Sequence, residues 1–196
     1  MPNDNPHITN SLLNSFKAFV GSHFLLNIIN GIQSDVILKA HKSAFDTLQL
    51  FNRVYKLALK QSNEQFTRLE ETLTFLTVYG ALEQIRFPNR KFPTIKIDGI
   101  NPENSIPTFV LQPFVENAWL LFLETKLHSF NISISTKDNT CSLLIDLKTN
   151  AQTHGKTNAK IELAFLRLEL LQDAGLLTYS ANWQKKSFFS LTIQTL

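Results

Sequence analysis

The chain has 196 residues, 43% of them apolar, which is enough to bury a core in one domain or two small ones. Its single cysteine excludes an internal disulfide, which argues against a disulfide-held secreted scaffold and favours a reducing compartment. The net charge of +3 is small, and no run of lysine or arginine predicts a nucleic-acid-binding arm. The six glycines form no cluster of the kind that wraps a nucleotide phosphate.

No stretch of the sequence predicts a membrane span or a secretion signal. Residues 1–10 are polar and lack the charged-then-apolar layout of a signal peptide. The apolar stretches 18–34 and 109–123 are interrupted by polar residues and fall short of the roughly 20 apolar residues that a spanning helix needs. We therefore expect a soluble, cytoplasmic protein without a transmembrane segment.

The first half of the chain is predicted to be helical. Apolar residues recur every three or four positions between about 8 and 86, and no proline interrupts them. This pattern predicts helices at about 8–38, 42–61 and 68–86. Thr67 and Glu70, three residues apart at the start of the third helix, predict a capping box.

The second half has a mixed pattern. Strands are predicted where apolar and polar residues alternate, at about 92–98, 131–137, 141–148, 176–182 and 187–194. Asp138 to Thr140 is a hairpin turn signal, and helices are predicted at about 107–128, starting at a proline, and 157–173. The fold class expected is α+β, with helices first and then an α/β sandwich with a mostly antiparallel sheet.

The first predicted helix is apolar almost all round. A helix with one wet side would show a single apolar stripe, whereas this one carries Phe19, Val20, Phe24, Leu25, Leu26, Ile28 and Ile29. We interpret the pattern as a homodimer in which the first two helices of each copy form a four-helix bundle. The alternative is one long core helix inside a monomer.

His23 lies in the middle of this apolar helix, and Asn27 follows one turn later. An imidazole nitrogen is a nucleophile at neutral pH, so His23 is a candidate phosphoryl acceptor. Position alone favours the plainer interpretation, a partly buried histidine hydrogen-bonded to Asn27. The histidines at 7, 41, 128 and 154 have no cysteine or carboxylate at ligand spacing, which argues against a zinc site.

A second candidate site lies at 107–118, where Glu116 and Asn117 interrupt a largely apolar helix. Both need partners, because unpaired polar groups are costly to bury. Asn117 could ligate Mg²⁺ at the phosphates of a nucleotide, since Mg²⁺ takes oxygen ligands. The alternative is a polar helix face that meets solvent.

Three segments together resemble one family. SHFLLNIIN at 22–30, LEQIRFPNR at 82–90 and IPTFVLQPFVENA at 106–118 follow the order and spacing of the LytS-like sensor histidine kinases. The signature of that family reads roughly PHFLFN, then an acidic residue ahead of RF, then LQPLVENA. Lys17-Ala18, the segment 51–56 and RLELL at 167–171 extend the resemblance over nearly the whole chain after about residue 15.

The resemblance implies a fold and a chemistry. It implies a dimerisation and histidine-phosphotransfer bundle followed by a GHKL-type ATP-binding domain. The corresponding domains are 1–62 for the bundle, 63–91 for a connecting helix and 92–196 for the ATPase-like part. In that family the histidine matching His23 accepts a phosphoryl group, and the asparagine matching Asn117, in the Glu116–Asn117 motif, holds Mg²⁺ at the ATP phosphates. His23 thereby becomes the favoured acceptor.

The sequence departs from the family where ATP should bind. Ser22 replaces a proline, and 119–123 replace a basic, glycine-containing stretch. The family's adenine-reading aspartate is missing around Thr149 to Ala151. Where the family has two glycines, this sequence has Asn158 and Lys160, and where the family has an asparagine, it has Leu163. Adenine recognition and close backbone approach to the phosphates are lost with these residues. We therefore expect a degenerate ATPase-like domain and no cofactor.

The phosphotransfer half is retained and basic. Between residues 8 and 62, six lysines and arginines stand against two aspartates, a net charge of +4. A basic face suits phosphoryl oxygens and an acidic receiver domain, although a solvated helix surface would look the same. Lys56 is predicted to neutralise the phosphoryl charge beside His23 and Asn27.

We therefore expect a homodimeric phosphorelay protein of a two-component system. As a histidine phosphotransferase or pseudokinase, it would pass phosphoryl groups between His23 and the receiver aspartates of a response regulator. One alternative is an active autokinase with an atypical ATP site, which alone would need Mg-ATP at Glu116 and Asn117. The other is a non-catalytic dimeric module that binds a response regulator. No nucleic-acid partner is expected.

Overall fold

The computed structural model describes residues 22–87, 95–99, 101, 104–124, 129–148, 159–184 and 188–195. Inside these ranges, the description does not extend to the side chains of residues 22–24, 86, 120–124, 129–130, 147–148, 159–160, 183–184 and 188. None of the helices in the described ranges is both long and apolar enough to cross a membrane.

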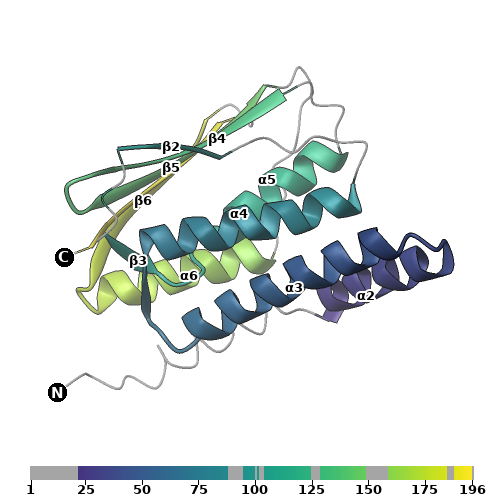
Figure 1. Ribbon diagram of the computed structural model, residues 1–196. Coiled ribbons are helices and arrows are strands. Elements are labelled where there is room, and N and C mark those ends of the chain that lie inside the picture. Colours follow the sequence, from purple (N-terminus) through teal and green to yellow (C-terminus); the bar gives the residue numbers. More distant parts are fainter. Residues whose placement is uncertain are drawn as a thin grey trace.

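Two antiparallel helices open the described chain. α2 (Ser22–Ile37) and α3 (His41–Gln61) form a hairpin, and its turn contains Lys39 in the left-handed conformation, with φ 58°. α3 buries Ala44, Thr47, Val54, Ala58 and Gln61 at the three- and four-residue spacing of one helix face. The hairpin packs on the side of α4 (Leu69–Arg86) that faces away from the sheet (Figure 1).

The rest of the chain forms a two-layer sandwich. α4, α5 (Gln112–Glu124) and α6 (Ala159–Asp173) cover one face of a five-stranded sheet (Figure 1). The strands, in spatial order, are β2 (Ile95–Asp98), β4 (Ser129–Lys137), β5 (Thr140–Lys148), β7 (Phe188–Thr195) and β6 (Leu177–Gln184). Among the described pairs of this sheet, β2–β4 is parallel and the others are antiparallel. The predicted α+β class with a mostly antiparallel sheet is confirmed.

A separate two-stranded ribbon joins the hairpin to the sandwich. β1 (Phe66–Arg68) follows α3 after the four residues 62–65 and pairs antiparallel with β3 (Ser105–Pro107). The amide of Leu69, the first residue of α4, continues the ribbon by donating to the carbonyl of Asn104 at 2.7 Å. Two segments that lie far apart in the sequence are therefore held side by side.

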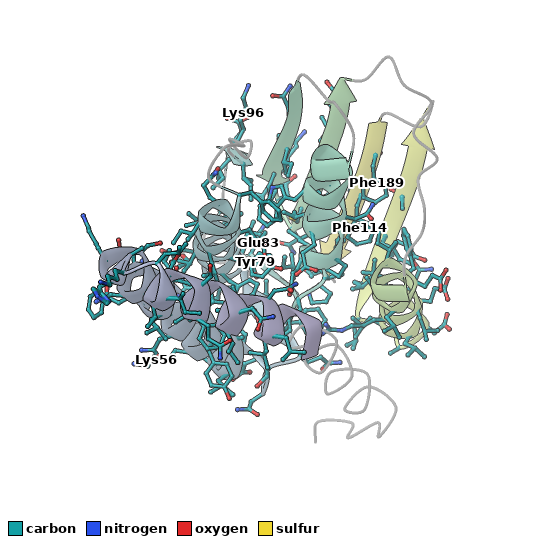
Figure 2. The ribbon with its side chains drawn as sticks, turned by 90° about the vertical axis from the view of Figure 1, so that its right-hand side faces the viewer. Lys56, Tyr79, Glu83, Lys96, Phe114 and Phe189 are labelled. Atoms are coloured by element: carbon teal, nitrogen blue, oxygen red, sulfur yellow. The ribbon has the colours of Figure 1, made fainter. Side chains whose placement is uncertain are left out.

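Alternation in the strands gives the sheet one apolar face. Ile132 and Ile134 of β4 and Leu143 of β5 are fully buried, whereas Ser133 and Ser142, their neighbours along the strands, are only half-buried. Aromatic rings fill the space between this face and the helices. Phe114 of α5 stacks on Phe189 of β7 with ring centroids 4.9 Å apart, and Figure 2 shows the two rings between helix and sheet.

Two local predictions are wrong, and strand pairing explains both. The capping box does not form, because Thr67 lies in β1 with its hydroxyl 2.6 Å from the Thr108 Oγ1, and the N-cap of α4 is Arg68. The helix predicted from Pro107 begins only at Gln112, because Pro107 pairs with Phe66 in the ribbon. Phe109 then bends the chain with a left-handed φ of 58°.

Other predictions fall outside what the structure describes. Residues 8–21 of the first predicted helix lie outside the described residues, so its start stays a prediction. The domain boundaries after residues 62 and 91 also stay predictions. The single cysteine, Cys141, is described and lies buried in β5, where desolvation raises the pKa of its thiol to about 12.

Close packing of α4 on α5 sets a testable limit at Gly80. A Cβ atom there would lie 3.1 Å from the Trp119 Cη2 atom, closer than ordinary contact. We predict that Gly80→Ala gains none of the about 1 kcal/mol that alanine usually adds in a helix, and that Gly80→Leu destabilises by about 1–3 kcal/mol. Urea unfolding measures both.

The matched control is Gly31→Ala in α2, where a Cβ would meet nothing within 4 Å. This variant should gain about 0.5–1 kcal/mol. An equal gain at Gly80 and Gly31 would contradict the close contact.

Candidate functional site

The candidate phosphoryl acceptor lies at the start of the hairpin. His23 is in the first turn of α2, and its side chain lies outside the described part of the chain. Asn27, one turn later, is half-buried. The turn of the hairpin centres on Lys39, so residue 23 stands level along the axis with residues 55–56 of the antiparallel α3.

Lys56 therefore lies at the same level of the hairpin as His23. Its side chain is exposed and points away from the sheet (Figure 2). Within the described residues it makes no ion pair, whereas Lys60, one turn on, pairs with Glu71 of α4 at 2.6 Å. The structure places His23, Asn27 and Lys56 on the same hairpin.

The hairpin also presents apolar side chains to solvent. Those that are at least 39% exposed are Leu26, Ile29, Val36 and Ile37 on α2 and Phe45, Leu48, Tyr55 and Leu59 on α3. The α3 members recur at three- and four-residue multiples and form one stripe beside the buried stripe. Exposed apolar side chains gathered on one helix face are typical of an interaction surface.

The second candidate site, on α5, is enclosed. Glu116 and Asn117 are each 7% exposed, and Gln112 is 4% exposed. The Gln112 Nε2 donates to the Glu116 Oε1 at 2.6 Å, across one turn of the helix. The polar residues predicted here thus lie in the interior, and the alternative of a polar helix face meeting solvent is wrong for them.

α4 packs against α5 one turn after Glu116. Trp119, one turn after Glu116, stacks on Tyr79 of α4 with ring centroids 5.7 Å apart. Glu83, one turn after Tyr79, is also buried (Figure 2). Trp119 stands where the resembling family has the start of its basic, glycine-containing stretch, so a stacked indole occupies that position.

The remaining departures are only partly described. Residues 149–158, where the adenine-reading aspartate and the first glycine are lost, lie outside the described residues, as do the side chains of Ser22, Leu120 to Leu123 and Lys160. Leu163 is described and lies exposed on α6. No group of three histidine, cysteine or acidic residues in the described ranges could hold a metal ion.

Sequence reasoning missed one buried charge. Arg167 of α6 is 3% exposed and donates to the backbone carbonyls of Thr108 and Gln65. Desolvation by burial lowers the pKa of its guanidinium to about 10. The sequence signal was the arginine of the RLELL segment, but its partners are carbonyls, which leave no mark in a sequence.

The sequence is similar to known histidine kinases. A family model described as Histidine kinase matches residues 11–91. The sensor histidine kinase BtsS of Escherichia coli (strain K12) is 28% identical over 144 residues, which cover 74% of this chain and 25% of BtsS. The sensor protein LytS of Bacillus subtilis (strain 168) is 34% identical over 106 residues, covering 54% of this chain and 18% of LytS. The chain spans about a quarter or less of the length of these relatives.

Solved structures show a weak likeness. A bacterial phosphotransferase aligns over 99% of this chain and 98% of its own, with 13% identity and a TM-score of 0.45. The cytoplasmic segment of the histidine kinase QseC aligns over 67% of this chain and 76% of its own, with 8% identity and a TM-score of 0.39.

The hairpin with the histidine motif and most of α4 lie in the part of the chain that the Histidine kinase family model matches, which supports a histidine kinase core. The BtsS and LytS relatives support, more narrowly, a LytS-like histidine kinase family for this chain. The resemblance found in the sequence is confirmed.

Proposed function

We propose that this protein is a histidine phosphotransferase of a two-component phosphorelay. It exchanges phosphoryl groups between His23 and the receiver aspartate of a response regulator. The observation that carries the proposal is the contrast between the two candidate sites: the hairpin is exposed and basic, whereas Asn117 is 93% withdrawn from solvent. A hydrated Mg²⁺ ion with a nucleotide needs open space at that amide.

The proposed transfer needs few groups on this chain. A lone pair on one imidazole nitrogen of His23 forms the bond to phosphorus as the phosphorus–oxygen bond to the receiver aspartate breaks, which leaves the aspartate as a carboxylate. The receiver supplies the Mg²⁺ for its own acidic site. The Lys56 ammonium, exposed and level with residue 23, neutralises phosphoryl oxygens, and Asn27 can hydrogen-bond the ring or an oxygen. The proposed response-regulator partner implies a cytoplasmic location for the protein.

The exposed apolar stripes on α2 and α3 support a homodimer. In a single copy these side chains stay wet, and burying them against the same stripes of a second copy completes a four-helix bundle with a two-fold axis. Each copy then carries one His23.

An active autokinase is the second candidate, because Glu116 and Asn117 are retained together on α5. Their burial, the Gln112–Glu116 hydrogen bond and the substituted glycines of the sequence weigh against it. The third candidate, a non-catalytic module that binds a response regulator, needs no phosphoryl acceptor.

The first prediction from the proposed function concerns His23. Incubation with a labelled, phosphorylated receiver should transfer label to the wild-type chain and not to His23→Gln. Removing one cation, as in Lys56→Gln, should slow transfer about tenfold through lost charge neutralisation. Rapid-quench electrophoresis measures the rate.

The matched control is His41→Gln, which removes an exposed histidine at the start of α3 and should transfer normally. Label on His23→Gln at the wild-type level contradicts the proposal. Receiver binding without any transfer in the wild type favours the non-catalytic module.

The second prediction concerns assembly. Light scattering should show a dimer at micromolar concentration, and Leu26→Glu with Leu48→Glu should give a folded monomer, because two charges would be buried in the bundle. Ile97→Glu, at an exposed apolar residue of β2, is the control and should stay dimeric. A wild-type monomer would sink the proposed bundle.

The third prediction concerns ATP. Calorimetry with Mg-ATP should give no heat of binding up to about millimolar concentration. The binding free energy of Mg-ATP would then be weaker than about 4 kcal/mol. A sub-millimolar dissociation constant that Asn117→Ala abolishes would restore the autokinase.

A further inference from the structure

The segment between the hairpin and the sandwich has the composition of a hinge. Residues 62–65, between the end of α3 and the start of β1, read Ser-Asn-Glu-Gln. Short polar connections between packed units are where relative motion usually concentrates. Here, however, residues from later in the chain hold the backbone of this segment by hydrogen bonds.

Among the described residues, three hydrogen bonds join the connector to later parts of the chain. The Thr108 hydroxyl donates to the carbonyl of Glu64 at 2.7 Å, and the Thr108 amide donates to the carbonyl of Gln65 at 3.1 Å. The Arg167 Nη2 donates to the same Gln65 carbonyl at 3.0 Å. The connector is thereby joined to the segment before α5 and to α6.

Arg167 binds both sides of this junction with one side chain. Its Nη1 donates to the carbonyl of Thr108, next to the left-handed bend at Phe109 that leads into α5. The two terminal nitrogens of a guanidinium diverge in a fixed fork, which lysine and glutamine lack. Among the described residues Arg167 has no carboxylate partner, and its Nε has no hydrogen-bond partner.

A buried guanidinium without a carboxylate carries a large desolvation cost. Burial lowers the pKa of Arg167 accordingly. The side chain nevertheless donates to two carbonyls, those of Thr108 and Gln65. Neither carbonyl belongs to α6, and the hydrogen bonds within α6 do not require these contacts. Its placement makes sense as a tie between them.

We propose that Arg167 is a positioning residue that clamps the exit of the phosphotransfer hairpin onto α5 and α6, so that hairpin and sandwich move as one body. The packing of α3 on α4 brings the two parts together, and the clamp removes the freedom of the connector. The inference does not depend on whether His23 exchanges phosphoryl groups.

The test measures distances across the clamp. Spin labels on Gln49→Cys of α3 and Ser180→Cys of β6, both exposed, report the orientation of the hairpin relative to the sheet. Labelled chain is mixed with excess unlabelled chain so that one copy per dimer carries labels. The buried Cys141 stays unlabelled. The wild type should give one narrow distance distribution.

Arg167→Gln should broaden this distribution about twofold and speed exchange of the Thr108 and Leu69 amides about tenfold, with β5–β7 amides unchanged. Arg167→Lys should not rescue it, because an ammonium lacks the fork. Thr108→Val, nearly isosteric, loses the side-chain hydrogen bonds to the Glu64 carbonyl and the Thr67 hydroxyl, and should broaden the distribution even if Arg167→Gln fails to fold. Arg53→Gln, at an exposed arginine of α3, is the control and should match the wild type.

Unchanged distributions in Arg167→Gln and Thr108→Val would overturn the clamp, even if local amide exchange increased. Full rescue by Arg167→Lys would also overturn it, since charge alone would then suffice. Broadening in Arg53→Gln equal to that in Arg167→Gln would show that the effect is not specific to the clamp and would count against it.

Discussion

Helix α4 is enclosed on two sides, and the arrangement of the other elements depends on this burial. Toward the sandwich, Phe75 meets Phe109 edge-on at 5.6 Å and Tyr79 stacks on Trp119. Toward the hairpin, α4 packs along α3, where Val54 and Ala58 are buried. A helix with two apolar sides cannot be stable alone in water. It joins the core of the hairpin and the core of the sandwich into one cluster.

Burial of α4 forces polar groups into the interior with it, and their partners then select the geometry. An unpaired buried donor or acceptor costs about 1–3 kcal/mol. Hydrogen bonding offsets this cost in three places: the Gln112–Glu116 pair, the Thr67–Thr108 pair and the bonds of Arg167. Two of the three connect segments far apart in the sequence. They favour one arrangement of hairpin, ribbon and α6 over other arrangements with equal apolar burial.

The two candidate sites, the hairpin with His23 and α5 with Glu116 and Asn117, have different surroundings. The hairpin keeps its histidine motif, an exposed cation at the same level and a wet apolar stripe. On α5, the residues that resemble a magnesium and nucleotide site are enclosed, and one of their neighbours is a stacked indole. This distribution supports the proposal that phosphoryl groups reach His23 from a receiver and not from a nucleotide on the same chain.

Periodicity in the sequence determined most of the elements: α3, α4, α6 and the strands β4 to β7 lie close to their predicted ranges. These patterns are local, because a helix or strand buries one face at a fixed spacing. The motifs at 22–30, 82–90 and 106–118 also determined the family. The tertiary structure alone decided that Thr67 pairs in β1 instead of capping α4, that α5 begins at Gln112, and that Arg167 reaches two carbonyls. The physical reason is that strand pairing and buried hydrogen bonds join residues such as Thr67 and Thr108, 41 positions apart, or Gln65 and Arg167, 102 positions apart. Backbone carbonyls, moreover, are the same in every sequence.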